Sequence, residues 1–188
     1  MPFSKIICAR CGTENHAANR FCAGCRIPLG SLEPDADAGT DILSAFEPPG
    51  PSAIDVDRLL REAVARTGFA SFTARQGWRI TVPLADNRRQ LVYLGHVGSD
   101  ITRHPIVGFV SVCGPANDRD ARILLKVNAN TVHSHFAIRT LRGEEYFVVI
   151  RNLRAEDLPE LDVAELVRGI AETADCMEGR LMRGKDLY

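Results

Sequence analysis

The sequence predicts an α+β fold, in which helices lie on an antiparallel sheet. Three observations predict it. An amphipathic helix pattern opens the segment from residue 53 onward, short β-branched and apolar runs bounded by turn residues follow, and a long helix pattern ends the chain. The expected order of elements in residues 53–188 is α-β-β-β-β-α-β-β-α.

The first helix is predicted over residues 53–67. Ser52 and Asp55 form the S-x-x-D pattern that is typical of a helix N-terminus. Gly68 stands where such a helix ends. Between these two signals, apolar residues recur at helical spacing and form one stripe: Val56, Leu59, Leu60, Ala63 and Val64.

Six strands are expected to make up the sheet. The last two should form a hairpin across Arg142-Gly143. The predicted strands are Phe69–Ala74, Trp78–Leu84, Gln90–Val97, Ile106–Cys113, Val132–Leu141 and Glu144–Arg151.

A shorter helix is predicted between the fourth and fifth strands, over Arg119–Asn128. Ile123, Leu124 and Val127 should share its apolar side. Four aromatic residues of the strand region are interpreted as the core of the sheet: Phe69, Phe72, Trp78 and Phe109.

The terminal helix has the clearest pattern in the chain and is predicted over residues 162–183. Asp162 and Glu165 form a second capping box at its start. Gly184 occupies the position expected of a C-terminal cap. Its apolar stripe comprises Val163, Leu166, Val167, Ile170, Ala174, Met177 and Leu181.

The 188 residues divide into a Cys-rich head (1–30), an acidic Pro/Gly/Ala-rich linker (31–52) and a body (53–188). The linker has too little apolar surface to offset the entropy lost on ordering, so we expect it to be flexible. Within it, residues 41–46 (Asp-Ile-Leu-Ser-Ala-Phe) are more apolar than their surroundings. Two interpretations stay open: a loop segment that packs on the body, and a short docking motif for a partner.

Composition argues against several classes of protein. The formal net charge is −1, which does not mark a binder of nucleic acid or of a membrane surface. The sequence contains no run of about eighteen apolar residues, so it predicts no transmembrane helix. The apolar part of the N-terminus is too short for a signal peptide. We therefore expect a cytoplasmic protein, in which the six cysteines favour metal binding over disulfides.

Four cysteines of the head have the spacing of a zinc site. Cys8 and Cys11 form one CxxC motif, and Cys22 and Cys25 form a second one after ten further residues. Four thiolates close a tetrahedron around Zn²⁺ at about 2.3 Å and leave no open position, so the zinc should be structural. Gly24 lies inside the second motif, where a small residue lets backbone N–H groups point at sulfur.

The alternatives to zinc are a redox pair and two disulfides, and the double CxxC pattern favours zinc over both. The head has too few large apolar residues for a core of its own, so the metal should supply its folding energy. Its basic residues would permit contact with nucleic acid. It lacks the dense basic face with interleaved aromatics that such binding needs, so a protein contact is the preferred interpretation.

The body offers few candidates for catalysis. His133 and His135 alternate on a predicted strand and should point to one face, but no third metal ligand accompanies them. Cys113 and Cys176 lie in apolar surroundings and are interpreted as small core residues. No phosphate-binding loop, nucleophile elbow or zinc-protease motif is present. These observations argue against an enzyme.

Several charged groups of the body are interpreted as solvated. The pairs Glu144-Glu145 and Glu156-Asp157 fall in turns or loops. The basic residues Arg88, Arg89, Arg103 and Arg119 are interpreted as loop edges.

Residues 8–29 resemble the small zinc ribbons that begin many bacterial proteins, with the pattern C-x2-C-G…F-C-x2-C and a difference at Arg26, where glycine is usual. The body resembles the type III secretion chaperone-like domain, which includes the YbjN-like proteins. That resemblance rests on element order, on residues 124–130 (Leu-Leu-Lys-Val-Asn-Ala-Asn) with the strand from His135, and on the terminal-helix stretch 171–178.

The resemblance implies a binding module. Such chaperones are usually homodimers that hold extended client segments on apolar sheet and helix surfaces. The sequence therefore favours a non-enzymatic adaptor or chaperone-like protein that binds a protein partner through its body. The first alternative is a nucleic-acid-binding regulatory protein that acts through the zinc ribbon. A further alternative is an enzyme that uses His133 and His135.

Overall fold

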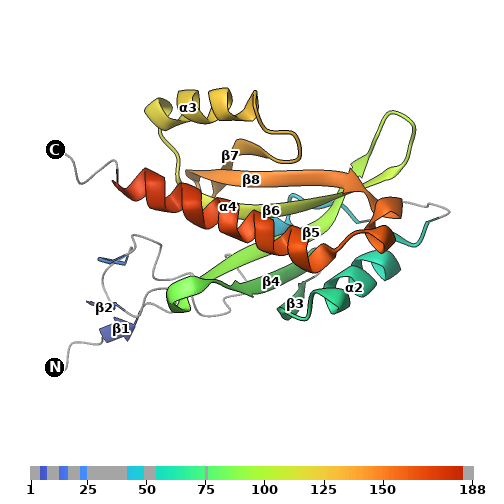
Figure 1. Cartoon of the computed structure of the whole chain (residues 1–188), viewed down its shortest axis with the longest axis horizontal. Coiled ribbons are helices and arrows are strands. Elements are labelled where there is room, and N and C mark those ends of the chain that lie inside the picture. Colours follow the sequence, from blue (N-terminus) through green and yellow to red (C-terminus); the bar gives the residue numbers. More distant parts are fainter. Residues whose placement is uncertain are drawn as a thin grey trace.

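The protein is described here from a computed structural model (Figure 1), which describes residues 5–7, 13–16, 22–24, 42–48, 54–74 and 76–183. Two short strands precede the body, β1 (Lys5–Ile7) and β2 (Glu14–His16). The helices of the body are α2 (Val56–Thr67), α3 (Asp118–Asn128) and α4 (Val163–Arg183). Its strands are β3 (Ala70–Ala74), β4 (Gly77–Pro83), β5 (Arg89–Ser99), β6 (Pro105–Pro115), β7 (His135–Leu141) and β8 (Glu144–Arg154).

The body contains one six-stranded sheet with the order β3-β4-β5-β6-β8-β7 and antiparallel pairing throughout. The first four strands form a meander, and the chain then crosses through α3 to the far edge. There β7 forms, and β8 returns to lie between β7 and β6. The element order is the predicted one, so the α+β class is confirmed.

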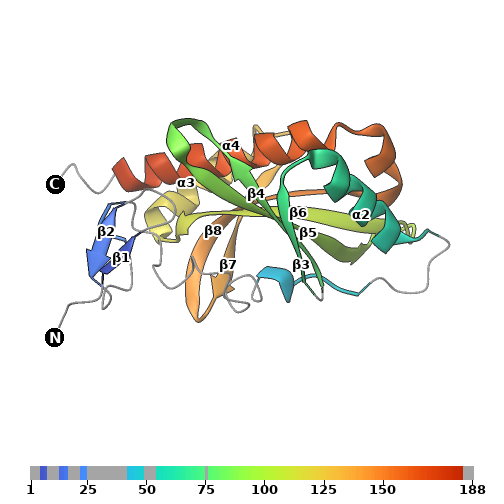
Figure 2. The same cartoon turned by 90° about the horizontal axis from the view of Figure 1, so that it is seen from below.

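Helices α4 and α2 cover one face of the sheet, and α3 stands beside them over β7 and β8 (Figures 1 and 2). The main core lies between this face and the helices. Its sheet side includes Phe109, Leu94 and Phe147, and its helix side includes Leu60 and Val167. Within the described residues, no helix is long and apolar enough to cross a membrane.

The helix boundaries follow from their caps. Asp55, rather than Ser52, caps α2: its carboxylate accepts a hydrogen bond from Arg58 N–H at 3.0 Å. The helix ends at Gly68, whose φ of 67° is the left-handed conformation that glycine adopts at low cost. The carboxylate of Asp162 likewise accepts from Glu165 N–H at 3.0 Å, as its capping pattern predicts.

Four strand predictions were wrong in extent. The strand expected from Val132 begins at His135, because the Asn128 side chain holds both backbone groups of Phe136 and keeps the preceding loop against α3. In the centre of the sheet, β5, β6 and β8 are each longer than predicted. Two β-bulges, at His96/Gly98 and Val112/Gly114, bend these pairs without ending them.

Two apolar residues are exposed: Phe72, which was interpreted as core, and Ile123, which was placed on the apolar side of its helix. Phe72 is 51% exposed, because β3 is an edge strand and this residue pairs with Arg79 on the face away from the helices. Its ring lies under the Arg79 guanidinium, 5.3 Å from the cation. Ile123 is also 51% exposed, because Leu124 alone on α3 is buried. By contrast, Trp78 and Phe109 are buried as predicted.

The apolar part of the linker packs on the face of the sheet opposite the helices. Ile42, Leu43 and Phe46 are all buried there, in a second cluster that includes Tyr93 and Val110. Figure 2 shows this light-blue segment below the sheet and the helices above it. Of the two interpretations of residues 41–46, the structure therefore supports packing on the body, and residues 42–48 are not a flexible linker. Residues 31–41 and 49–52 lie outside the described residues.

Replacing Phe109 with alanine is expected to lower the free energy of unfolding by about 3–5 kcal/mol, because the ring is fully buried between sheet and helices. Phe72→Ala serves as the matched control. It removes an exposed ring and one cation–π contact, so it should cost about 1 kcal/mol or less. Urea unfolding monitored through the fluorescence of Trp78 measures both values. Equal losses would show that this description of the core is incorrect.

Candidate functional site

One zinc-ligand candidate, Cys22, lies within the described residues, and its surroundings suit a thiolate. The residue is buried, and its Sγ accepts hydrogen bonds from Gly24 N–H at 3.3 Å and from Asn15 Nδ2 at 3.5 Å. Donors aimed at sulfur stabilise the ionised thiol, which is the form that binds metals. The position of Gly24 is the one that the sequence predicted.

Asn15 connects β2 to the second CxxC motif, and sequence reasoning missed it. Its Nδ2 also donates to Thr13 O at 2.7 Å, and its Oδ1 accepts from Ala23 N–H at 2.7 Å. This buried amide thus fixes the backbone around Cys22. No local signal in the sequence marks it, because its partners Cys22 and Ala23 follow seven and eight residues later in the chain.

The other three ligand candidates, Cys8, Cys11 and Cys25, lie outside the described residues. In sequence, the first CxxC motif falls between β1 and β2. Among the residues that the structure does describe, no three His, Cys, Asp or Glu side chains gather as a metal site. The donors around Cys22 fit a zinc–thiolate bond, and the four-cysteine site stays a prediction.

The two histidines proposed as a shared site are both exposed. His135 begins β7, whereas His133 precedes the strand in a bend, so the expected alternation along one strand is wrong. The physical reason is the same Asn128 contact that shortens β7. Any joint role for the two side chains would depend on the loop between α3 and β7.

The two remaining cysteines of the body differ in environment. Cys113 is fully buried, and burial together with the nearby Glu178 carboxylate raises the pKa of its thiol to about 12. Such a thiol is neutral and unreactive at physiological pH. Cys176 is exposed on α4, so its assignment to the core was wrong. It lies outside the apolar stripe that faces the sheet.

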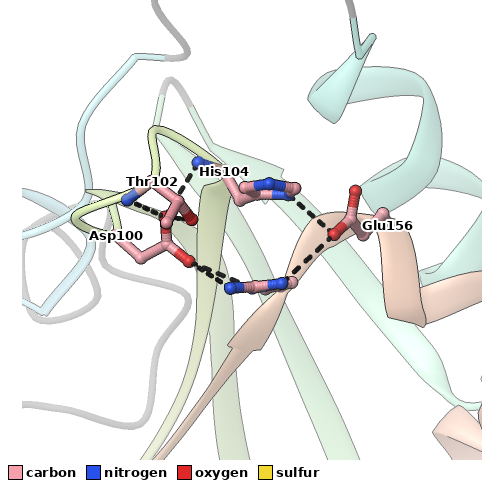
Figure 3. A network of polar contacts seen from close by, with 5 residues as sticks. Asp100, Thr102, His104 and Glu156 are labelled. Atoms are coloured by element: carbon pink, nitrogen blue, oxygen red, sulfur yellow. Dashed lines mark hydrogen bonds and ion pairs between the residues drawn. The ribbon is translucent and has the colours of Figure 1, made fainter.

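A network of polar contacts closes the hairpin between β5 and β6 (Figure 3). One carboxylate oxygen of Asp100 accepts from Thr102 N–H at 2.8 Å, Thr102 Oγ1 at 2.7 Å and His104 N–H at 3.0 Å. The other oxygen accepts from Arg154 Nε at 3.0 Å. These contacts hold the pKa of Asp100 well below its ordinary value of 3.8, with the Thr102 hydroxyl as the largest cause.

Glu156, which follows β8 in sequence, contacts two members of this network. Its Oε1 lies 2.7 Å from His104 Nδ1 and 3.8 Å from Arg154 Nη1. A histidine beside a carboxylate resembles a base with its orienting group. Here, however, the contacts join the hairpin turn to β8 and to the 3-10 helix η3 (Ala155–Glu160). We interpret the network as a clamp on the sheet end, in which Glu156 takes part while it stays exposed, as the sequence predicted.

The sequence contains a local signal for part of this clamp. Asp followed two residues later by Thr is typical of an Asx-turn, in which the carboxylate bonds the backbone ahead of it. Long-range ion pairs have no such signal. Arg88, expected at a solvated loop edge, places Nη1 2.7 Å from the Asp175 carboxylate on α4. This pair ties the β4–β5 turn to the terminal helix.

One unit of the body concentrates exposed apolar and basic side chains. Seven large apolar residues are exposed within the described part of the chain, and four of them lie between residues 118 and 141. Three exposed basic residues of α3 are spaced three and then four positions apart, so they share the side of the helix opposite the buried Leu124. We name this the α3–β7 surface; it comprises Ile123, Leu125, Val132 and Ile138 with Arg119, Arg122 and Lys126.

Within the described residues, none of the three cations of the α3–β7 surface forms an ion pair. The acidic residues of α3, Asp118 and Asp120, stand in its first turn, where their charge complements the helix dipole. Strand β7 beside it is the edge of the sheet, so one side of its backbone pairs with no described strand. The surface thus combines apolar area, positive charge and a strand edge.

Comparison with known proteins shows a similarity in structure and none in sequence. No protein-family model matches the sequence, and no curated protein matches it. Among solved structures, the chain is similar to YbjN from E. coli, a proposed transcription regulator. The similarity has a TM-score of 0.45 and 12% identity, and it covers 72% of this chain and 96% of YbjN.

The Asp100 contacts predict a pH-dependent contribution to stability. Because folding lowers the pKa of this carboxyl, its contribution is complete above the ordinary value of 3.8 and declines as pH falls below it. The stability difference between the wild type and Asp100→Asn should therefore be largest and constant above about pH 5 and shrink toward pH 3.

Urea midpoints at pH 7, 5 and 3 measure this difference. Glu172→Gln is the control, because this exposed carboxylate of α4 forms no hydrogen bond or ion pair with a described residue. A difference for Asp100→Asn that stays the same at all three pH values would contradict the assignment.

Proposed function

We propose that the protein is a non-enzymatic, zinc-binding adaptor whose α+β body binds a protein partner. The observation that carries the proposal is the α3–β7 surface. Exposed apolar patches are typical of contacts for another macromolecule, and four of the seven exposed large apolar side chains of the described residues lie on α3, β7 and the loop between them. Its two most exposed members, Leu125 at 68% and Val132 at 87%, would bury substantial area in a complex.

Charge suggests the chemistry of the partner. Arg119, Arg122 and Lys126 form a positive stripe between Ile123 and Leu125. The complementary segment carries acidic residues among apolar ones. In such an interface the apolar side chains contribute most of the affinity, and the exposed charges contribute mainly orientation and association rate. The open edge of β7 offers backbone groups to the same segment.

The proposal that the protein is not an enzyme rests on the contacts and environments of the side chains that could act in catalysis. The His104–Glu156 pair belongs to the clamp at the sheet end, and the buried Cys113 thiol stays protonated. The exposed His133 lies in the loop between α3 and β7, and the exposed His135 begins β7, next to the proposed contact surface. These groups therefore support structure or binding rather than acid–base chemistry.

The zinc-binding part rests on the four-cysteine spacing and on the donors around Cys22. One Zn²⁺ on Cys8, Cys11, Cys22 and Cys25 would fold the head and present it as a second contact module. Two modules on one chain raise the effective concentration of the second at a shared target. The head would then strengthen binding without contributing chemistry.

Replacing Cys22 with serine is expected to reduce the zinc content of purified protein from one ion per chain to nearly none, because three remaining thiolates bind zinc far less tightly. Cys176→Ser is the matched control, since it removes an exposed thiol of α4 and should leave the zinc content unchanged. Elemental analysis with titration of free thiols measures both. Zinc-free wild-type protein with four reactive head thiols would contradict the site.

The double variant Arg122→Glu/Leu125→Asp is expected to reduce capture of the protein partner at least tenfold, because it replaces both the charge and the apolar contact. Arg61→Glu/Ile101→Asp is the control, with an exposed cation of α2 and the fully exposed hairpin residue. Cross-linking and mass spectrometry of tagged full-length protein in host cells measure the recovery. Captured nucleic acid that nuclease removes, with no protein affected by the variant, would favour the nucleic-acid alternative instead.

A further inference from the structure

A buried asparagine connects the two CxxC motifs of the head. Asn15 lies on β2 and is 4% exposed, and its side chain forms three hydrogen bonds. Its Nδ2 donates to Thr13 O at 2.7 Å, two residues after Cys11, and to Cys22 Sγ at 3.5 Å. Its Oδ1 accepts from Ala23 N–H at 2.7 Å. One amide thus joins the chain that follows the first motif to the start of the second.

The hydrogen-bond partners determine the orientation of this amide. Ala23 N–H can only donate and Thr13 O can only accept, so the side-chain oxygen must face the first and the nitrogen the second. A flipped amide would place two donors against each other and two acceptors against each other. The group of Asn15 that lies beside Cys22 Sγ is therefore an N–H donor.

The sulfur of Cys22 accepts a second hydrogen bond from within its own motif. Gly24 N–H lies 3.3 Å from Sγ, so two groups that can only donate are aimed at this atom. Such donors stabilise negative charge on sulfur, both in a free thiolate and in a thiolate bound to a metal ion. Because Cys22 is fully buried, this effect is stronger than it would be in water.

The geometry gives the amide two separable effects on a bound metal. Its bonds to Thr13 O and Ala23 N–H hold the backbone of the head, which affects how tightly the ion is held. Its bond to Cys22 Sγ acts on the electrons of the sulfur, which also affects charge transfer from sulfur to metal. Groups that contact a ligand in this way typically change metal affinity by about 10- to 100-fold.

We propose that Asn15 is a positioning residue of the zinc site in the head, and that it increases the affinity for Zn²⁺ by joining the two CxxC motifs and by donating to the sulfur of Cys22. The inference rests on the four-cysteine site proposed above. It gives a role in metal binding to a residue that is not itself a ligand.

Competition for Zn²⁺ between the full-length chain and a chromophoric chelator measures this effect. Asn15→Ala removes all three bonds and should weaken zinc binding by roughly tenfold or more. Asn15→Asp keeps the side-chain volume and the acceptor for Ala23 N–H, but it replaces both donations with a negative charge, so it should weaken binding further. Asn87→Asp is the matched control and should leave the affinity unchanged, because this exposed amide forms no hydrogen bond with a described residue.

Cobalt in place of zinc tests the bond to sulfur separately from the hold on the backbone. Co²⁺ bound to thiolates absorbs light by charge transfer from sulfur to metal, and a hydrogen bond to the sulfur raises the energy of this transition. At saturating Co²⁺ the band should therefore move to longer wavelength in Asn15→Ala, and further in Asn15→Asp. The fluorescence of the buried Trp78 verifies that the body of each variant is folded.

Unchanged zinc affinity in both variants would overturn the role of Asn15, and so would weaker binding with a charge-transfer band that does not move. Loss of all Co²⁺ binding by both variants at saturating metal would overturn it too, because four thiolates should still bind the ion without this amide. Wild-type protein that binds neither metal would instead contradict the four-cysteine site itself, and the role of Asn15 with it. The wild type therefore distinguishes a failure of the zinc site from a failure of this inference alone.

Discussion

The structure depends on burying three central strands from both sides. Strands β5, β6 and β8 carry near-continuous apolar runs rather than an alternating pattern, and a strand of that kind needs cover on each face. Helices α2 and α4 supply one cover. The opposite cover is the short segment around Phe46, which lies before the body in sequence. Its contact with the sheet explains why a chain of few helices can hold so apolar a sheet centre.

Local patterns were sufficient to predict the elements and their order. Asp55 and Asp162 cap their helices through contacts three residues away, so a short window of sequence contains the whole signal. Exposure was harder to predict, because it depends on position in the sheet. Phe72 is exposed since β3 is an edge strand, and Ile123 is exposed since α3 rests on the body mainly through Leu124.

In the candidate sites, too, the features with a local sequence signal could be predicted, and those that depend on long-range contacts could not. The CxxC spacing and the role of Gly24 could be predicted, since both lie within one motif. Three other contacts join residues that are distant in sequence or lie on different elements: Asn15 with Cys22, Arg88 with Asp175, and Phe46 with Gly77 and Gly95. No periodicity encodes such contacts. Gly77 and Gly95 lie on separate strands, and no pattern in the sequence indicates that Phe46 packs against both.

The placement of β8 has a consequence for how the chain matures on the ribosome. This strand is synthesised last among the six, yet it must insert between β6 and β7, and α4 follows it still later. Until then the nascent chain exposes the edge of β6 and the apolar face that α4 will cover. Slow, long-range strand pairing of this kind favours aggregation of incomplete chains. Truncation within β8 should therefore yield insoluble rather than merely unstable protein.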